Sequence, residues 1–169
     1  LTKNPNIGMI GSRAIIINEK GKKINRSFNL CQSSEIEWAL HFENQFFHSS
    51  IMIRKNILEK YKIKYGLSIN YKKIMYQTKD YYNEAEDFLL WIIINNFCEV
   101  ANLKDFLIFH RVHSKSKSQL NKKLLDKSYI ICCQTKMSLT MNNPVDFETA
   151  SFLLLNQMTK KLTFFNYMR

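Results

Sequence analysis

The sequence predicts a mixed α/β fold over residues 1–118, followed by a helical extension over residues 119–169. Three observations predict it. Residues 7–17 are rich in isoleucine, and residues 24–30 follow them after a turn-forming segment, as the two arms of a hairpin do. Residues 106–113 alternate between two faces, as in a strand. Beyond residue 118, apolar side chains recur at helical spacing instead.

The first element expected is a strand over residues 7–17, IGMIGSRAIII. Residues 18–21 (NEKG) form the turn, and residues 24–30 return antiparallel. Gly8 and Gly11 are interpreted as turn glycines, because the spacing of a phosphate-binding glycine loop is absent from the sequence.

A β-prone stretch at residues 46–53 is followed by a helical pattern through Leu58 and Tyr61, which Gly66 is expected to end. Residues 67–82 are rich in Tyr and Lys without clear periodicity, and we expect them to be irregular.

Residues 83–94 combine acids with the longest apolar run of the chain. Asn83 is expected to cap a helix whose first turn holds Glu84, Glu86 and Asp87, where the helix dipole favours negative charge. Residues 88–94 are apolar on every face, so this helix should be buried. The asparagines at 95 and 96 indicate its end.

The last strand expected covers residues 106–113, with Phe106, Ile108 and His110 on one face. A helix follows the polar segment SKSKS, and Asn143 with Pro144 should cap and open a final helix.

Composition limits the classes of protein. The chain has 169 residues, of which 46% are hydrophobic, with 4 Gly and 2 Pro, which excludes a disordered or collagen-like chain. The seven-residue apolar run at 88–94 is far shorter than the ~20 residues that span a bilayer. Four cysteines without metal-ligand spacing are best interpreted as reduced thiols. The net charge is 25 − 14 = +11, which suits nucleic acid, anionic lipid or a phosphorylated substrate, and does not choose among them.

The three acids before the apolar run have two interpretations. Capping one helix end requires a single short side chain, so three carboxylates exceed that need. A carboxylate placed against the apolar run should be partly desolvated, which raises its pKa toward the range of a general base. Helix capping and acid–base chemistry therefore both remain open at this point.

Four segments occur in a fixed order: IGMIGSRAIIINEKGK, FFHSSIMIRK, NEAEDFLLWIII and FLIFHRVHSKSKS. Together they resemble the C-terminal half of family 2 glycosyltransferases, which have the nucleotide-sugar-binding GT-A fold. In that family a strand and turn precede a His-Pro-Ser segment with a following Arg. An acidic helix start with Leu-Trp comes next, and a strand ending in Arg-x-His closes the pattern. The resemblance covers residues 5–118 and implies a partial GT-A fold with a helical C-terminal extension.

The resemblance also implies roles for individual residues. Asp87 matches the base that deprotonates the acceptor hydroxyl in an inverting transfer, and Glu86 matches its companion. Arg111 and His113 match the motif near the donor diphosphate and its divalent metal, so His113 is a candidate metal ligand. His48 and Glu84 would lie in the vicinity of the acceptor, although Ser49 stands where the family has Pro.

The Asp-x-Asp motif that holds metal and diphosphate in the family is absent from the sequence. We therefore expect an acceptor-side fragment that is inactive alone, with the main Mg or Mn ligands in a missing N-terminal half. Its partners would be a nucleotide-sugar donor and a cell-surface glycan or lipid-linked acceptor. No nucleic acid is expected in this case.

The expected location is the cytoplasm, at the inner face of the membrane, where the basic and aromatic residues 160–169 would assist docking. An open sheet edge would favour self-association. The alternative from another class is a non-catalytic basic module that binds nucleic acid or an anionic membrane surface.

Overall fold

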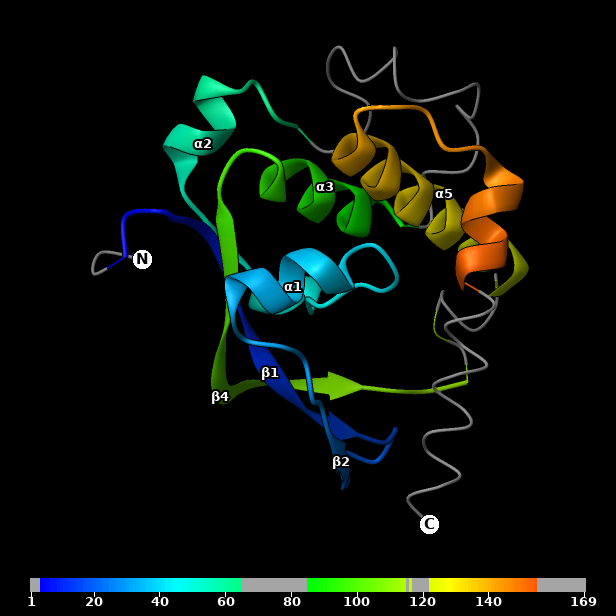
Figure 1. The fold of residues 1–169 in the computed structure, drawn as a ribbon. Helices are drawn as coiled ribbons and strands as arrows, with labels where there is room; N and C mark the ends of the chain where they lie inside the picture. The colour runs from blue at the N-terminus through cyan, green and yellow to red at the C-terminus, as the bar shows by residue number, and fades with distance from the viewer. Residues whose placement is uncertain (1–3, 65–84, 115, 117–121, 155–169) are drawn as a thin grey trace.

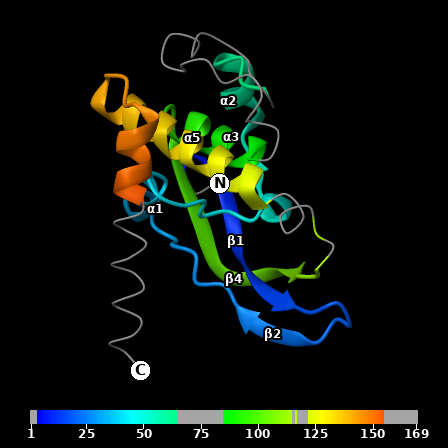
Figure 2. The same ribbon diagram turned by 90° about the vertical axis from the view of Figure 1, so that its right-hand side faces the viewer.

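The computed structural model describes residues 4–64, 85–114, 116 and 122–154. These residues form a mixed α/β structure in which helices cover one side of an open sheet (Figures 1 and 2). Several sequence-based expectations lie outside the described residues. These are the helix end at Gly66, the irregular segment 67–82, the site residue Glu84 and the tail 160–169.

The sheet is built around β1 (Ile7–Ile17), which pairs on both of its edges. On one edge β4 (Glu99–Arg111) runs parallel to β1 along its whole length. On the other edge β2 (Lys23–Arg26) and the short β3 (Met52–Ile53) pair antiparallel with the two ends of β1. The predicted hairpin is confirmed with a shorter second arm, and the predicted last strand begins seven residues earlier than expected.

The alternation expected along β4 is interrupted by an irregularity in the strand register. Arg13 and Ala14 of β1 are neighbours, but their partners Phe106 and Ile108 are two residues apart. The extra residue, Leu107, leaves Phe106 on the face of Phe109 rather than on that of Ile108. The prediction that Phe106 and Ile108 share a face was therefore wrong, because a bulge reverses the alternation that follows it.

Gly8 and Gly11 lie inside β1 and not in a turn, so their interpretation as turn glycines was wrong. A Cβ at Gly8 would lie 2.9 Å from Cβ of Cys98, and a Cβ at Gly11 would lie 3.0 Å from a ring carbon of Phe46. Both glycines are needed because neighbouring chain approaches β1 closely. Gly21, with φ of 78°, is the glycine that the hairpin turn requires.

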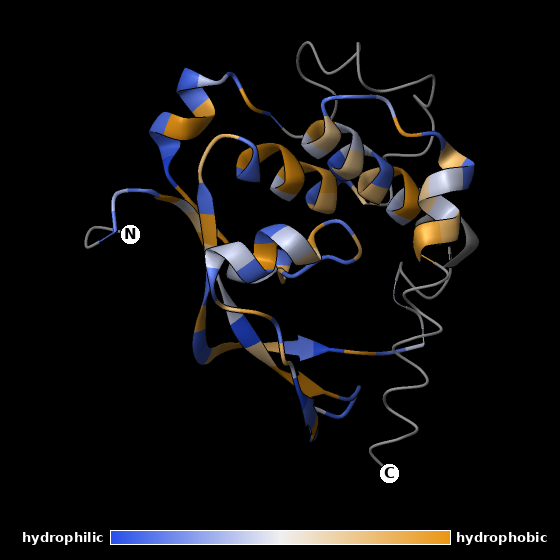
Figure 3. Cartoon of the chain, viewed as in Figure 1, coloured by the Kyte–Doolittle hydropathy of each residue, from blue (hydrophilic) through white to orange (hydrophobic). Residues whose placement is uncertain are grey.

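The central helix α3 (Glu86–Asn95) confirms the buried helix expected from the apolar run. Its residues from Phe88 to Asn95 are all buried, and Figure 3 shows hydrophobic colour along most of its length. It ends at the two asparagines as expected. The prediction that Asn83 caps the helix was wrong, because the N-cap is Ala85, which offers no side-chain hydrogen bond.

The remaining helices surround α3. They include α1 (Ser33–Ala39), which no sequence pattern predicted, the single 3₁₀ turn η1 (His48–Ser50), α2 (Lys55–Lys60) and α5 (Lys122–Met141). The last helix begins at residue 147 rather than at Pro144. Asp146 caps this helix. The Asp146 carboxylate accepts hydrogen bonds from the backbone N–H of Thr149 at 2.8 Å and from the Thr149 hydroxyl at 2.6 Å.

Helix α5 packs directly on the α/β part of the chain. The Lys136 amino group is buried and donates to Oδ1 of Asn95 at 2.8 Å, with a carboxylate oxygen of Glu37 at 3.8 Å. Nε2 of His41 lies 2.9 Å from the Thr140 hydroxyl. These contacts join α5 to α1 and α3, so the predicted extension contributes to the same core.

The cysteines and the helix lengths bear on two general properties of the chain. All four cysteines are free thiols, as expected. Within the described part of the chain, every helix is too short or too polar to cross a membrane.

Candidate functional site

Asp87 lies in the first turn of α3 and is partly buried. Its Oδ1 accepts a hydrogen bond from the backbone N–H of Phe88 at 2.6 Å. Burial raises the pKa of the Asp87 carboxyl above its usual value, and the neighbouring Glu86 raises it further. The Phe88 hydrogen bond acts in the opposite direction and does not cancel the effect of burial. The partly desolvated acid expected at this helix start is therefore present.

His48 approaches this helix from η1, 39 positions earlier in the chain. Its ring packs edge-on against the Trp91 indole, with the ring centroids 5.9 Å apart. It is close enough to Asp87 that its charge lowers the Asp87 pKa. The short turn is held against the sheet because the Ser50 hydroxyl accepts from the backbone N–H of Ser12 at 3.1 Å. The fold thus brings together two of the predicted site residues.

Tyr129 of α5 is a third member of this group, although no sequence motif marked it as a site residue. Its ring packs on Phe88 with centroids 5.1 Å apart, and its hydroxyl is hydrogen-bonded to the side chain of Asn44. Burial, together with the Asp87 charge, raises the pKa of Tyr129 to about 12. Tyr129 is therefore a protonated phenol at neutral pH. Helical spacing was its only sequence signal, and it lies beyond the segments that carry the family resemblance.

Trp91, on which the His48 ring packs, adds a buried hydrogen-bond donor to this group. Trp91 is fully buried, and its Nε1–H has no hydrogen-bond partner among the described residues. A buried N–H without a partner costs free energy, so such groups are rare in native proteins. We call Asp87, His48, Tyr129 and Trp91 the Asp87 cluster.

Cys132 borders the Asp87 cluster without adding a nucleophile. Its thiol is fully buried and donates a weak hydrogen bond to the carbonyl of Ala85 at 3.7 Å. Burial raises the Cys132 pKa well above its usual value, and the nearby acids raise it further. A thiol that stays protonated is a poor nucleophile, so acid–base chemistry suits this cluster better than covalent chemistry.

Arg111 and His113 lie elsewhere, at the end of the sheet where β4 passes the hairpin turn. Nη1 of Arg111 donates to the carbonyls of Asn18 at 3.0 Å and Glu19 at 2.6 Å. His113 follows two residues later, beside Ser114, whose backbone N–H donates to a Glu19 carboxylate oxygen at 3.3 Å. The contacts of Arg111 hold the turn on β4 and do not reach the Asp87 cluster. The predicted role of Arg111 and His113 near a donor diphosphate stays a prediction.

The expected divalent metal was compared with the side chains that the described structure gathers. Nowhere in residues 4–64, 85–114, 116 and 122–154 do three or more His, Cys, Asp or Glu side chains converge as metal ligands would. His113 therefore has no ligand set around it in this part of the chain, and Glu84 lies outside it. The residues described do not fit a metal site, so we derive no step through one.

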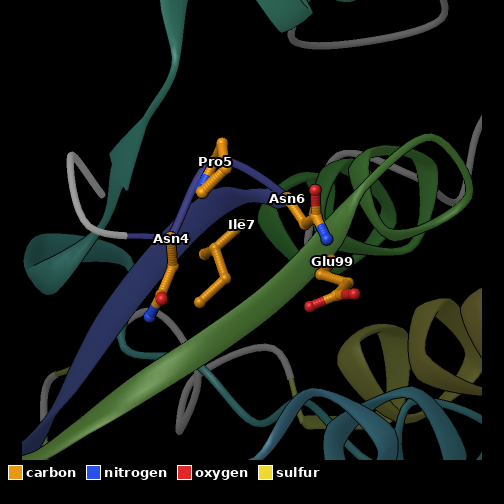
Figure 4. A pocket seen from close by; sticks show the side chains of 5 residues that line it. All are labelled: Asn4, Pro5, Asn6, Ile7 and Glu99. Atoms are coloured by element: carbon orange, nitrogen blue, oxygen red, sulfur yellow. The ribbon is translucent and has the colours of Figure 1, made fainter.

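A hollow of about 300 Å³ lies at the opposite end of the sheet, where β1 and β4 begin. Figure 4 shows its lining by Asn4, Pro5, Asn6, Ile7 and Glu99. Glu99 follows the C-terminal end of α3, whereas Asp87 lies at the N-terminal end. One carboxylate among two asparagines, a proline and an isoleucine offers no acid–base pair. The Asp87 cluster is thus the better candidate for chemistry.

The sequence matches no protein-family model, and no curated protein matches it significantly.

Proposed function

We propose that this chain is the acceptor-side part of an inverting family 2 glycosyltransferase, with Asp87 as the general base. The observation that carries the proposal is the partly buried carboxylate of Asp87, which is raised in pKa and flanked by His48 and Tyr129. The four ordered sequence segments support the same class, and the mixed α/β sheet is compatible with part of a GT-A fold.

The geometry suggests how Asp87 would act. Its Oδ1 is held by the Phe88 N–H, which leaves Oδ2 to accept the proton of an acceptor hydroxyl. As that proton moves to Oδ2, the acceptor oxygen bonds to the anomeric carbon of the donor. The bond from this carbon to the diphosphate oxygen breaks, and the nucleoside diphosphate leaves with inversion of the anomeric centre. A raised carboxyl pKa favours the base because it brings the proton affinity closer to that required at neutral pH.

The other members of the cluster would position the acceptor. The protonated Tyr129 is a hydrogen-bond donor, and a sugar presents many hydroxyl oxygens that accept. The fully buried Trp91 indole would support the His48 ring instead. His48 would limit how far the Asp87 pKa rises, because its charge favours the ionised carboxylate. Donor binding is assigned to residues outside this chain, with Arg111 and His113 as contributors by resemblance.

The proposal is tested by sugar transfer. The chain would be assayed alone and together with a polypeptide that supplies an Asp-x-Asp donor-binding half, using labelled nucleotide sugars and oligosaccharide acceptors. We expect transfer only from the combination, with Asp87→Asn lowering kcat about 10²–10⁴-fold. The exposed Asp105→Asn is the matched control and should leave the rate unchanged. Transfer that survives Asp87→Asn would overturn the role of Asp87. Turnover by the chain alone would overturn the need for a separate donor half.

A further inference from the structure

The end of the sheet opposite the helices forms a surface that lies outside the Asp87 cluster. We call it the sheet end: residues 15–26 of the hairpin and residues 107–114 of β4 and the loop after it. Figures 1 and 2 both place β2 and the neighbouring ends of β1 and β4 on the side of the molecule away from α1, α3 and α5. This part of the sheet is therefore a projecting ribbon.

Large apolar side chains are exposed on the sheet end. Leu107 is 62% exposed, Phe109 61%, Ile24 54% and Val112 38%. A single exposed apolar residue is ordinary, but several gathered on one projecting element mark a surface that becomes covered by something.

Positive charge surrounds these apolar groups. The sheet end carries Lys20, Lys22, Lys23, Arg26 and Arg111 against one acid, Glu19, so its formal charge is 5 − 1 = +4. Two of the cations lie over aromatic rings. The Lys23 Nζ is 5.8 Å from the Phe109 ring centroid, and the Arg26 guanidinium carbon is 5.4 Å from that of Phe106. Cations and apolar surface are thus interleaved on the same strands.

The backbone of the sheet end is well fixed. Oδ1 of Asn18 accepts from the backbone N–H groups of Lys20 at 3.0 Å and Lys22 at 2.9 Å, and Arg111 donates to the turn from the other side. Since the turn is already ordered, little conformational entropy is lost when the surface binds.

We propose that the sheet end binds the surface of an anionic lipid bilayer, with its lysines and arginines at the headgroups and its apolar side chains at the acyl boundary. Lipid fits better than nucleic acid, because the exposed aliphatic side chains of Ile24, Leu107 and Val112 gain from hydrocarbon and not from bases or phosphates. It fits better than a second copy, because two surfaces of charge +4 repel each other. This inference does not rest on sugar transfer.

The experiment is co-sedimentation of the full chain with vesicles of phosphatidylcholine, with and without 30 mol% phosphatidylserine (about a third of the lipid, enough for a marked surface potential). We expect binding only to the anionic vesicles. Lys20→Gln with Lys22→Gln should weaken it about fivefold for each charge removed. Lys55→Gln with Lys60→Gln on α2 is the matched control, since it removes the same charge far from the sheet end.

A second pair of variants tests the apolar contribution. Phe109→Ser should weaken binding to anionic vesicles at least fivefold, whereas Phe152→Ser, which changes a ring of 65% exposure in the last helix, should not. Circular dichroism and Tm establish that each variant is folded. Deleting residues 160–169 should leave binding unchanged, which separates the sheet end from the tail.

Three results would overturn the proposal. The first is equal binding to neutral and anionic vesicles. The second is equal loss from the sheet-end variants and their controls. The third is binding of single-stranded oligonucleotides, or dimerisation in solution, that depends on Phe109 and Lys20 while vesicle binding does not. Each leaves the Asp87→Asn transfer assay unaffected, so the two proposals fail separately.

Discussion

The close approach of β1 to the segment after α3 makes Gly8→Ala a sharp test of the fold. The added Cβ would overlap Sγ of Cys98 and lie 2.9 Å from its Cβ and 3.3 Å from Cγ1 of Ile57. Comfortable carbon contacts are about 3.5–4.0 Å, so the neighbours must move. Cys98 is not free to turn aside without loss, because its thiol donates to the carbonyl of Ile94 at 3.4 Å.

The expected cost follows from overpacking. Forcing an extra methyl into a packed site costs about 1–3 kcal/mol, which for a chain of this length lowers Tm by about 2–12 °C. Urea unfolding followed by tryptophan fluorescence measures the free energy of unfolding, and thermal unfolding measures Tm. The denaturant slope should stay unchanged, because the surface exposed on unfolding hardly differs.

A double-mutant cycle identifies the cause. Cys98→Gly removes the two nearest atoms, so the Gly8→Ala penalty should shrink by at least 1 kcal/mol in that background, about twice the error of additivity in such cycles. Cys98→Ala, which keeps Cβ, should give partial relief. Gly21→Ala is the control: nothing lies within 4 Å of its added Cβ, and its cost comes from its positive φ. Additive Gly8 and Cys98 effects, or a Gly8→Ala chain as stable as the parent, would refute the steric argument.

Three further predictions concern buried polar groups. Asp87→Asn should stabilise the chain at pH 7. Burial raises the pKa of Asp87 in the folded state, so the stability that this carboxyl contributes is full below pH ~4 and is lost as the pH rises through the raised pKa. Urea titrations of both chains from pH 4 to 7 should therefore diverge with rising pH, and convergence would contradict the burial. Burial lowers the pKa of Lys136, so the parent should gain stability relative to Lys136→Met as pH rises toward ~10.5, and unfolding at pH 7 and pH 10 measures this. Asn102→Ala should cost about 1–3 kcal/mol, because Nδ2 of Asn102 donates at 2.9 Å to the carbonyl of Leu30, which would lose this partner. The carbonyl of Gln45 would keep the Nδ2 of Asn29 at 2.9 Å. A loss below 0.5 kcal/mol in urea (about the error of such a comparison) would show that the Leu30 carbonyl finds another partner.

One expectation about the surroundings of Asp87 is confirmed. An acid beside an apolar helix was expected to be desolvated, and burial does raise the Asp87 pKa. The family resemblance placed His48 near the same site, and the fold brings His48 close to Asp87. Tyr129 was not foreseen as a member, because its approach depends on how α5 packs on α3, and no local pattern encodes that packing.

What the sequence determined by itself is the identity of the elements that local periodicity specifies. The buried helix of residues 88–94, the hairpin around residues 18–21 and the helix after residue 121 follow from spacing and turn chemistry, which act over a few residues.

Tertiary structure alone decided the rest. It placed Gly8 against Cys98, inserted Leu107 as an extra residue in β4 and left Arg111 at the sheet end rather than beside Asp87. Each of these depends on contacts between segments tens of residues apart, whose geometry is set by packing against the sheet and not by the neighbours in sequence.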